Sequence, residues 1–258
     1  MYLSRIELTE AIAGQSQLGL LLQDRSYGMH RLLWDLFASD ERFLFREESA
    51  GEQLGRARNL PLYYVLSAEK PVTSSPIFNI SSKAFQPKLV VGEKLAFKLR
   101  ANPTISRHEE GKKNSKRHDV IMDAQYQFLT AACKVRGLPN SFKKSELRKF
   151  LFSHPDFNEE KNRKEFILSL NNAVETAAIE WIKKRGDNHG YLVDSAQATG
   201  YRWNALPEKD RHAGFSSMDY EGVLTVTNPE IFIPMLTSGL GPSKAFGCGL
   251  MLIRRTNG

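Results

Sequence analysis

Short segments in which apolar and polar residues alternate recur through the first hundred residues, and one amphipathic helical segment lies among them. Alternation with a period of two is typical of a strand with one buried face, whereas apolar residues three and four positions apart indicate a helix. The pattern predicts strands at residues 2–8, 43–45, 62–66 and 94–100, a helix from Ser26 to about Phe37, a turn at 51–59 and a short helical turn at 81–86.

The order strand, helix, strand, strand, short helix, strand is that of the ferredoxin-like fold, in which helices pack on one face of an antiparallel sheet. Farther along, we expect helices at 123–135, 145–152 and 165–185, a loop-rich stretch, a strand at 218–227, a helix from Pro229 to Gly239 capped by Asn228, and a last strand at 250–253. The sequence thus predicts an α+β fold with two ferredoxin-like (RAMP/RRM-like) domains in tandem and a helical insertion. The expected divisions are an N-terminal domain with the amphipathic helix (1–101), a basic loop (102–123), the insertion (124–174) and a C-terminal domain with a glycine-rich loop (175–258).

Composition and cysteine use narrow the class of protein. The 258 residues are 41% hydrophobic and 25% charged, which is ordinary for a globular protein and excludes a disordered chain. No apolar run approaches the roughly 18 residues of a membrane span, and the charged, alternating N-terminus does not resemble a cleaved signal. Cys133 and Cys248 are isolated thiols, which favours a reducing cytoplasm over a disulfide framework or a zinc ribbon. We expect a cytoplasmic protein with no membrane contact, no metal and no cofactor.

Positive charge is concentrated in two stretches. Residues 94–118 hold eight Lys and Arg against two Glu, a net charge of +6, and residues 134–149 hold six Lys and Arg against one Glu. Such stretches suit a polyanion, because each neutralised phosphate releases condensed counterions. A solvated loop on a basic protein is the alternative, and charge alone does not decide between them. The candidates for contact with a polyanion in the first stretch are Lys98, Arg100, Arg107, Lys112, Lys113, Lys116 and Arg117.

The predicted N-terminal helix could carry chemistry on the side opposite its core stripe. Helical spacing gathers Met29, Leu32, Leu33, Leu36 and Phe37 on one side, and Tyr27, His30, Arg31 and Trp34 on the other. Histidine supplies a base or acid near neutral pH, tyrosine can orient or donate a proton, arginine stabilises anionic charge, and tryptophan stacks on a base. The alternative is that Trp34 packs under the second domain and His30 only lies on the surface. His118, Asp119 and Asp123 lack further ligands at metal-binding spacing, so we expect a loop there.

A glycine-rich run extends from Gly239 to Gly249. Its glycines allow the backbone to approach a phosphate, and Ser243 and Lys244 add a hydroxyl and a charge. The GxxxxGK[ST] order is absent and the run precedes a strand, which argues against a P-loop and a Rossmann fingerprint. We favour contact with a nucleic-acid backbone through Gly241, Gly247 and Gly249, with a purely structural turn as the alternative.

Taken together, these residues are similar to a known family. The resemblance is carried by Met1-Tyr2-Leu3-Ser4-Arg5, the Tyr27-x-x-His30-x-x-Leu33-Trp34-x-Leu36-Phe37 helix, Phe43-Leu44-Phe45, Leu99-Arg100-Ala101-Asn102-Pro103, Phe215 to Thr227 with Glu221-Gly222-Val223-Leu224-Thr225, and Gly239 to Leu250. In this order they resemble the CRISPR RNA-processing endoribonucleases of type I-E systems, the CasE or Cse3 family, which are subunits of the Cascade complex. The chain departs from compact members in residues 125–174, to which the resemblance assigns no role.

The resemblance implies metal-independent cleavage of precursor CRISPR RNA within the repeat hairpin, by attack of a 2′-hydroxyl on the adjacent phosphate. It assigns the catalytic His to His30 and its partner to Tyr27. The electrostatic role falls to Arg31 or Lys244, because Asp35 stands near the place of a Lys that some members carry. The implied partners are the repeat RNA hairpin, as precursor and as mature CRISPR RNA, and the other Cascade subunits. Two alternatives stay open, a non-catalytic RNA-hairpin-binding subunit of a CRISPR ribonucleoprotein and a nucleotide-dependent enzyme that uses the glycine run.

Overall fold

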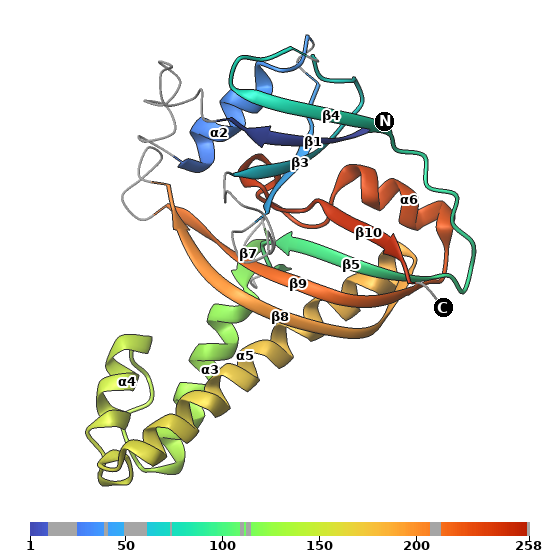
Figure 1. The fold of residues 1–258 in the computed structure, drawn as a ribbon. Helices are drawn as coiled ribbons and strands as arrows, with labels where there is room; N and C mark the ends of the chain where they lie inside the picture. The colour runs from blue at the N-terminus through green and yellow to red at the C-terminus, as the bar shows by residue number, and fades with distance from the viewer. Residues whose placement is uncertain are drawn as a thin grey trace.

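The computed structural model of the chain describes residues 1–9, 25–38, 41–48, 61–72, 74–108, 111, 115–206 and 213–256, with side chains from residue 28 in the second of these ranges. Two antiparallel four-stranded sheets lie one above the other, and a helical arm projects from the lower sheet, at the lower left of Figure 1. No helix in the described ranges is long and apolar enough to cross a bilayer.

The first sheet contains the N-terminal strands. They are β1 (Tyr2–Leu8), β2 (Leu44–Glu48), β3 (Leu62–Ser67) and β4 (Phe78–Ala84), in the order β2-β3-β1-β4. Helix α2 (Arg25–Trp34) packs on one face, and its apolar stripe of Met29, Leu32, Leu33 and Leu36 is buried against residues of the sheet, as its spacing predicts. The strand order, with the first and third strands in the centre, is that of a ferredoxin-like sheet.

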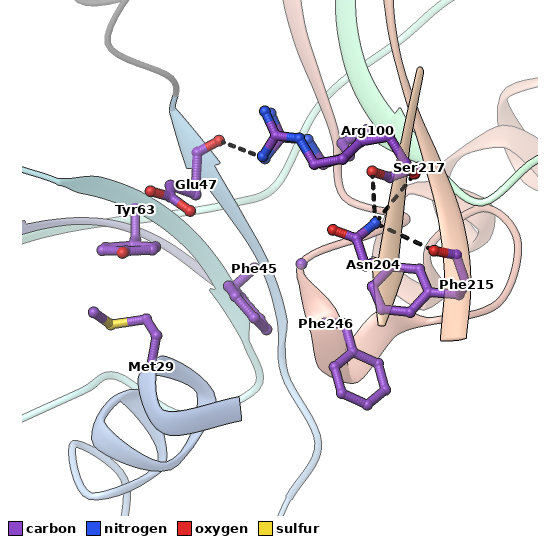
Figure 2. Close-up of a pocket in the computed structure, with 11 residues that line it drawn as sticks. Met29, Phe45, Glu47, Tyr63, Arg100, Asn204, Phe215, Ser217 and Phe246 are labelled. Atoms are coloured by element: carbon purple, nitrogen blue, oxygen red, sulfur yellow. Dashed lines mark hydrogen bonds between the residues drawn. The ribbon is translucent and has the colours of Figure 1, made fainter. Parts of the chain in front are cut away.

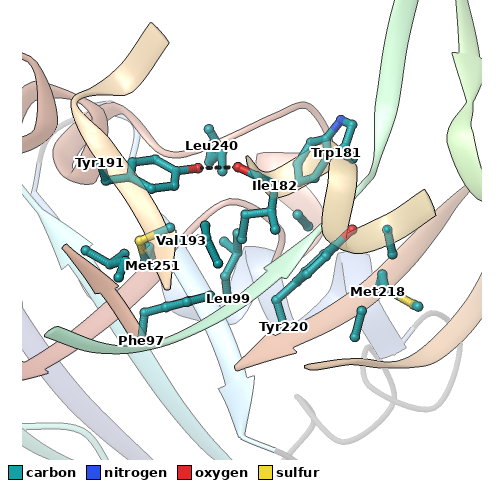
Figure 3. Close-up of a cluster of buried hydrophobic side chains, with 14 of the residues drawn as sticks. Phe97, Leu99, Trp181, Ile182, Tyr191, Val193, Met218, Tyr220, Leu240 and Met251 are labelled. Carbon is teal, nitrogen blue, oxygen red and sulfur yellow. Dashed lines mark hydrogen bonds between the residues drawn. The ribbon is translucent and has the colours of Figure 1, made fainter. Parts of the chain in front are cut away.

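The second sheet repeats this arrangement. It is formed by β5 (Lys94–Ala101), β8 (Tyr191–Ala205), β9 (Gly214–Val226) and β10 (Met251–Arg255), in the order β10-β5-β9-β8. Helices α5 (Glu160–His189) and α6 (Pro229–Ser238) contribute to the same apolar core, in which the Tyr191 hydroxyl donates a hydrogen bond of 3.2 Å to the Ile182 carbonyl (Figure 3). The Asn228 side chain caps α6 by accepting from the Glu230 amide at 3.0 Å, which confirms the predicted start of this helix. Both sheets therefore have the predicted ferredoxin-like order.

Three sequence-based expectations are corrected. The basic strand 94–100 was expected to close the first sheet, but β5 pairs with β9 and β10, because its apolar side chains belong to the second core. The expected helical turn at 81–86 is largely strand β4, which forms a ladder with β1. The expected loop-rich stretch contains β8, which pairs with β9 along its length. The expected turn at 51–59 lies outside the described residues.

The helical arm joins β5 to β8. After β5 the chain forms a hairpin of β6 (Thr104–Arg107) and β7 (Lys116–Asp119), then α3 (Val120–Val135), α4 (Lys144–Phe152), the short η3 (Pro155–Phe157) and α5. The outer part has a small apolar core of its own, formed by Leu129, Cys133, Leu147, Leu151 and Phe157. At 1.5 Å per residue, the 30 residues of α5 extend about 45 Å, so one continuous helix runs from the arm into the second core. Residue 174, the expected C-terminal boundary of the insertion at 124–174, thus lies inside α5, which continues through it without a break.

The two sheets contact each other through the glycine-rich segment (239–249). Leu44 and Leu66 of the first sheet are buried together with Leu250, which follows that segment. Gly247 has a φ of +79°, and a Cβ there would lie 3.2 Å from the Phe45 ring. The left-handed backbone and the close approach both favour glycine at this position. The segment is therefore a packed junction between the two units.

Candidate active site and RNA-binding surface

His30 lies on α2 beside a group of aromatic rings. Its imidazole is half-buried, with ring centroids 5.3 Å from Trp34, 5.3 Å from Phe43 and 5.8 Å from Phe45. Desolvation by these neighbours lowers the pKa of His30 below its usual value of 6.5. The ring is therefore neutral at pH 7, which is the form that accepts a proton.

The other three candidates on α2 have different environments. Arg31 is exposed, in agreement with an outward position. Trp34 was expected on the side away from the core, but it is half-buried and packs on the first core, 5.4 Å from the Phe43 ring. A ring held in this way has less surface for stacking on a base. The Tyr27 side chain lies outside the described residues.

The short helix η4 (Lys244–Phe246) of the second unit contacts both α2 and β2. The ammonium of Lys244 donates a 2.5 Å hydrogen bond to the Ser238 carbonyl, at the C-terminal end of α6, and desolvation lowers the pKa of Lys244. Ser243 has a φ of +62°, which is uncommon for a residue other than glycine, and its hydroxyl accepts a 2.9 Å hydrogen bond from the Asn102 side chain. Asn102 thus connects the end of β5 to the glycine-rich segment next to α2.

The three glycines expected to contact a nucleic-acid backbone do not share one environment. Gly247 and Gly249 are buried, Gly247 against Phe45, and the Gly249 amide donates a 2.7 Å hydrogen bond to the Arg100 carbonyl. Gly241 is only half-buried. For Gly247 and Gly249 the geometry favours the structural alternative. Phe45 of the first unit occupies the space beside Gly247, and Leu240 and Lys244 of the second unit occupy the space beside Gly249.

A small cavity of about 50 Å³ lies where the two units meet (Figure 2). Ligand pockets usually measure about 300–1,000 Å³, so this cavity is a seam between the units and too small for a nucleotide. Its lining includes Met29, which is adjacent to His30, and Arg202 of β8. The Arg202 side chain is exposed and has no hydrogen bond or ion pair with any described residue. Sequence reasoning missed this cation because it expected a loop at this position.

Arg100 forms part of a charged network between the units. Its guanidinium donates to both carboxylate oxygens of Asp219, at 2.9 and 3.0 Å. It also donates to the Glu47 carbonyl at 3.4 Å, and Figure 2 shows this bond. Arg46 of β2, only 2% exposed, donates to the same carboxylate at 3.4 Å. Burial lowers the pKa of Arg100, but hydrogen bonding and the charge of Asp219 outweigh this effect and raise it. Arg100 was expected to contact RNA, and the structure instead uses its charge to join β2 to β5 and β9.

The remaining basic candidates lie on two surfaces. Arg107, Lys116 and Arg117 are exposed on the β6–β7 hairpin, which replaces the expected loop, and Arg107 also pairs with Asp123 at 2.9 Å. Lys98 instead lines a groove of about 800 Å³ between the sheets, where it pairs with Glu221 at 4.0 Å. Lys112 and Lys113 lie outside the described residues. We refer to Arg107, Lys116 and Arg117 as the basic hairpin.

The thiols of Cys133 and Cys248 are free and buried. Burial raises the pKa of Cys248 to about 12. Such a thiol is protonated at neutral pH and is a poor nucleophile. Within the described ranges, no three His, Cys, Asp or Glu side chains lie close enough to hold a metal ion.

Two ferredoxin-like sheets in tandem, joined by a glycine-rich segment, place the chain in the class of double ferredoxin-like, RAMP-type proteins. A family model described as "CRISPR associated protein" matches residues 1–255, and the chain belongs to this family. The resemblance to CasE and Cse3 proteins is thereby confirmed.

Comparisons with individual proteins agree with this assignment. The chain is 24% identical over 232 residues to the CRISPR system Cascade subunit CasE of Escherichia coli (strain K12), covering 87% of this chain and 89% of that protein. The crystal structure of Cas6e from E. coli K-12 matches with a TM-score of 0.57 and 22% identity over 99% of this chain and all of that one. Cse3 of Thermus thermophilus, solved with an RNA representing a pre-cleavage complex, matches with a TM-score of 0.63 and 21% identity over 98% of each chain. At this level of identity the structural matches establish the fold.

Proposed function

We propose that this protein is an endoribonuclease that cleaves precursor CRISPR RNA within the repeat hairpin and remains bound to its product as a Cascade subunit. Membership of the CRISPR-associated family supports this proposal, as does the similarity to a Cascade subunit and to a protein solved with pre-cleavage RNA. The observation that carries it is the half-buried imidazole of His30, whose pKa is lowered, on a helix that also contacts η4 of the glycine-rich segment.

The reaction needs a base, an acid and a positive charge, and it needs no metal in this proposal. Neutral His30 takes the proton from the 2′-hydroxyl, and the 2′-oxygen attacks the adjacent phosphorus. The bond to the 5′-oxygen then breaks, and that oxygen receives a proton, so the products end in a 2′,3′-cyclic phosphate and a 5′-hydroxyl. We assign Tyr27 to orienting or donating a proton. Arg31, Lys244 and the Ser243 hydroxyl are the candidates for stabilising the charged phosphate.

Recognition of the hairpin is assigned to the basic surfaces. The major groove of A-form RNA is too deep and narrow for side chains to read, so shape and backbone contacts dominate. The exposed cations of the basic hairpin are suited to such contacts. Gly241 is a further candidate, as is Trp34, whose ring lies 5.3 Å from that of His30. The relative from E. coli is a Cascade subunit, which supports the other Cascade subunits as protein partners.

The test is cleavage of repeat RNA in the presence of EDTA, with mapping of both product ends. His30→Ala should lower the rate at least 100-fold, since general acid–base catalysis contributes about 10²–10⁴-fold, while affinity for the hairpin stays within a few-fold. His154→Ala is the matched control, because it removes an imidazole at the start of η3 in the arm. Full activity of His30→Ala, or loss of wild-type activity in EDTA, would contradict the mechanism.

A non-catalytic hairpin-binding subunit is the second candidate. It is favoured by the bond of the Lys244 ammonium to the Ser238 carbonyl and by Asp35 directly after α2, because neither arrangement supplies a free lysine beside His30. Wild-type protein that binds repeat RNA tightly but never cuts it would establish this alternative.

A further inference from the structure

Helix α4, in the arm, has an exposed face made of cations and one hydroxyl. Leu147 and Leu151 are buried on its inner side, whereas its only exposed positions are Ser145, Arg148 and Lys149. The exposed Lys143 precedes the first turn. We call Lys143, Arg148 and Lys149 the basic edge of α4.

The charges of this edge are not neutralised by the protein. Among the described residues, none of the three side chains pairs with a carboxylate, and Glu146, the only acid in 134–149, accepts the Lys143 backbone amide at 3.2 Å. Lysines on the neighbouring α5 are paired instead, Lys164 with Glu160 at 2.9 Å and Lys161 with Glu165 at 3.9 Å. The basic edge is therefore a net positive surface that an external anion can neutralise.

The edge begins close to the basic hairpin. The ammonium of Lys144, the first residue of α4, donates a 2.9 Å hydrogen bond to the Gln125 side chain in the second turn of α3. Burial lowers the pKa of Lys144, and the nearby carboxylates of Asp119 and Asp123 oppose this shift. Asp119 is the last residue of the hairpin and the N-cap of α3, so α4 starts beside the base of the arm. The base of the basic hairpin and the start of α4 thus meet near Asp119 and Asp123.

We infer that the basic edge of α4 binds the phosphate backbone of the RNA that the body of the protein holds. This inference rests on the proposed function. Its physical basis is that the exposed positions of α4 itself are cations and a hydroxyl, which suit phosphate oxygens. Phe142, exposed beside Lys143, is the one apolar side chain at this edge among the described residues of 141–149. The helical arm therefore lengthens the RNA-binding surface.

The test compares two triple variants that remove the same charge. The first is Lys143→Gln, Arg148→Gln and Lys149→Gln, and the control is Lys161→Gln, Lys164→Gln and Lys184→Gln on α5, whose lysines lie near Glu165, Glu160 and Glu180. The Kd of repeat RNA is measured from 50 to 200 mM salt. Three lost phosphate contacts lower the log–log salt slope by about 2 to 3, so the fall in affinity across this range should be about 20- to 40-fold smaller than for the wild type. The control should keep the wild-type slope.

Each outcome has a defined meaning. Equal slopes for the wild type and the α4 variant would overturn the inference and assign the arm to a protein partner. Equal reductions in both variants would also overturn it, because they would report net charge and not a local contact. If the wild type cuts repeat RNA while the α4 variant keeps the wild-type slope, only this inference fails. A wild-type protein that neither binds nor cuts the RNA contradicts the proposed function itself. Far-ultraviolet circular dichroism establishes that both variants are folded.

Discussion

Asp219→Asn is expected to be the most damaging single change at the junction of the two units. The Asp219 carboxylate accepts two hydrogen bonds from Arg100 and one from Arg46. The Arg46 side chain is 2% exposed and that of Arg100 is 15% exposed, so the substitution removes a negative charge that two poorly hydrated guanidinium groups share. Removing one partner of a buried ion pair costs about 3–5 kcal/mol. The carboxylate is itself 30% exposed, which places the expected loss near 3 kcal/mol, at the lower end of that range.

Urea denaturation followed by circular dichroism measures this loss as a change in the free energy of unfolding. For a chain of this size, about 3 kcal/mol corresponds to a fall in Tm of about 6–12 °C. Glu221→Gln is the matched control on the same strand, because Glu221 is 60% exposed and its pair with Lys98 spans 4.0 Å. An exposed pair of this kind contributes less than about 1 kcal/mol.

A second variant separates burial of charge from loss of packing. Adding Arg46→Met to Asp219→Asn removes one of the two guanidinium groups that shared the Asp219 carboxylate, so the double variant should be more stable than Asp219→Asn alone. The reasoning is refuted if Asp219→Asn and Glu221→Gln lower the free energy of unfolding by the same amount. It is also refuted if the double variant loses as much stability as the single variants Asp219→Asn and Arg46→Met lose together.

Four further results are expected. Because the pKa of His30 is lowered in the folded state, the unfolded chain binds more protons below pH 6.5. The free energy of unfolding should therefore decrease as the pH is lowered in that range, and more steeply for the wild type than for His30→Asn. Identical pH profiles for the two proteins would contradict this. The cleavage rate should be constant near pH 7 and decline with a midpoint below 6.5, whereas a decline that starts above pH 7 would exclude His30 as the base. Gly247→Val should lower the free energy of unfolding by more than 1 kcal/mol, because it forces a branched side chain into a left-handed backbone beside Phe45. The same change at exposed Gly137, which has open space around it, should lower the free energy of unfolding by less. Urea titrations of both variants measure the difference. Lys116→Gln with Arg117→Gln should lower the salt slope of RNA binding by about 1 to 2, and an unchanged slope would remove the basic hairpin from the interface.

Sequence patterns correctly predicted those helices and strands in which buried and exposed residues follow each other at regular spacing. The stripe Met29, Leu32, Leu33 and Leu36 predicted which face of α2 is buried, because 3.6-residue spacing places these residues on one side whatever the rest of the chain does. Strict alternation in residues 94–100 likewise predicted a strand. Neither pattern contains information about the partner strand, and this is why β5 was placed in the wrong sheet.

Elements with irregular burial were missed. Strand β8 has bulges between Val193 and Ser195 and between Thr199 and Arg202, and Gly200 has a φ of +66°. Each bulge shifts the alternation by one position, so the strand shows no period of two. Strand β4 is largely polar and lies at an edge of its sheet, and its pairing with β1 is what makes it a strand. Arg202 was overlooked as a candidate for the same reason.

The sequence by itself determined the pair of α+β units, the buried face of α2, the caps and the residues similar to the CasE and Cse3 family, because each depends on short-range spacing or on residue identity. Only the tertiary structure decided that Arg100 is neutralised by Asp219, that Gly247 packs against Phe45 of the first unit, and that Trp34 joins the first core. In each case the deciding contact lies on an element distant in sequence. A residue pattern fixes which side of a helix or strand is apolar, whereas the identity of the neighbour across that side is set by how the whole chain folds.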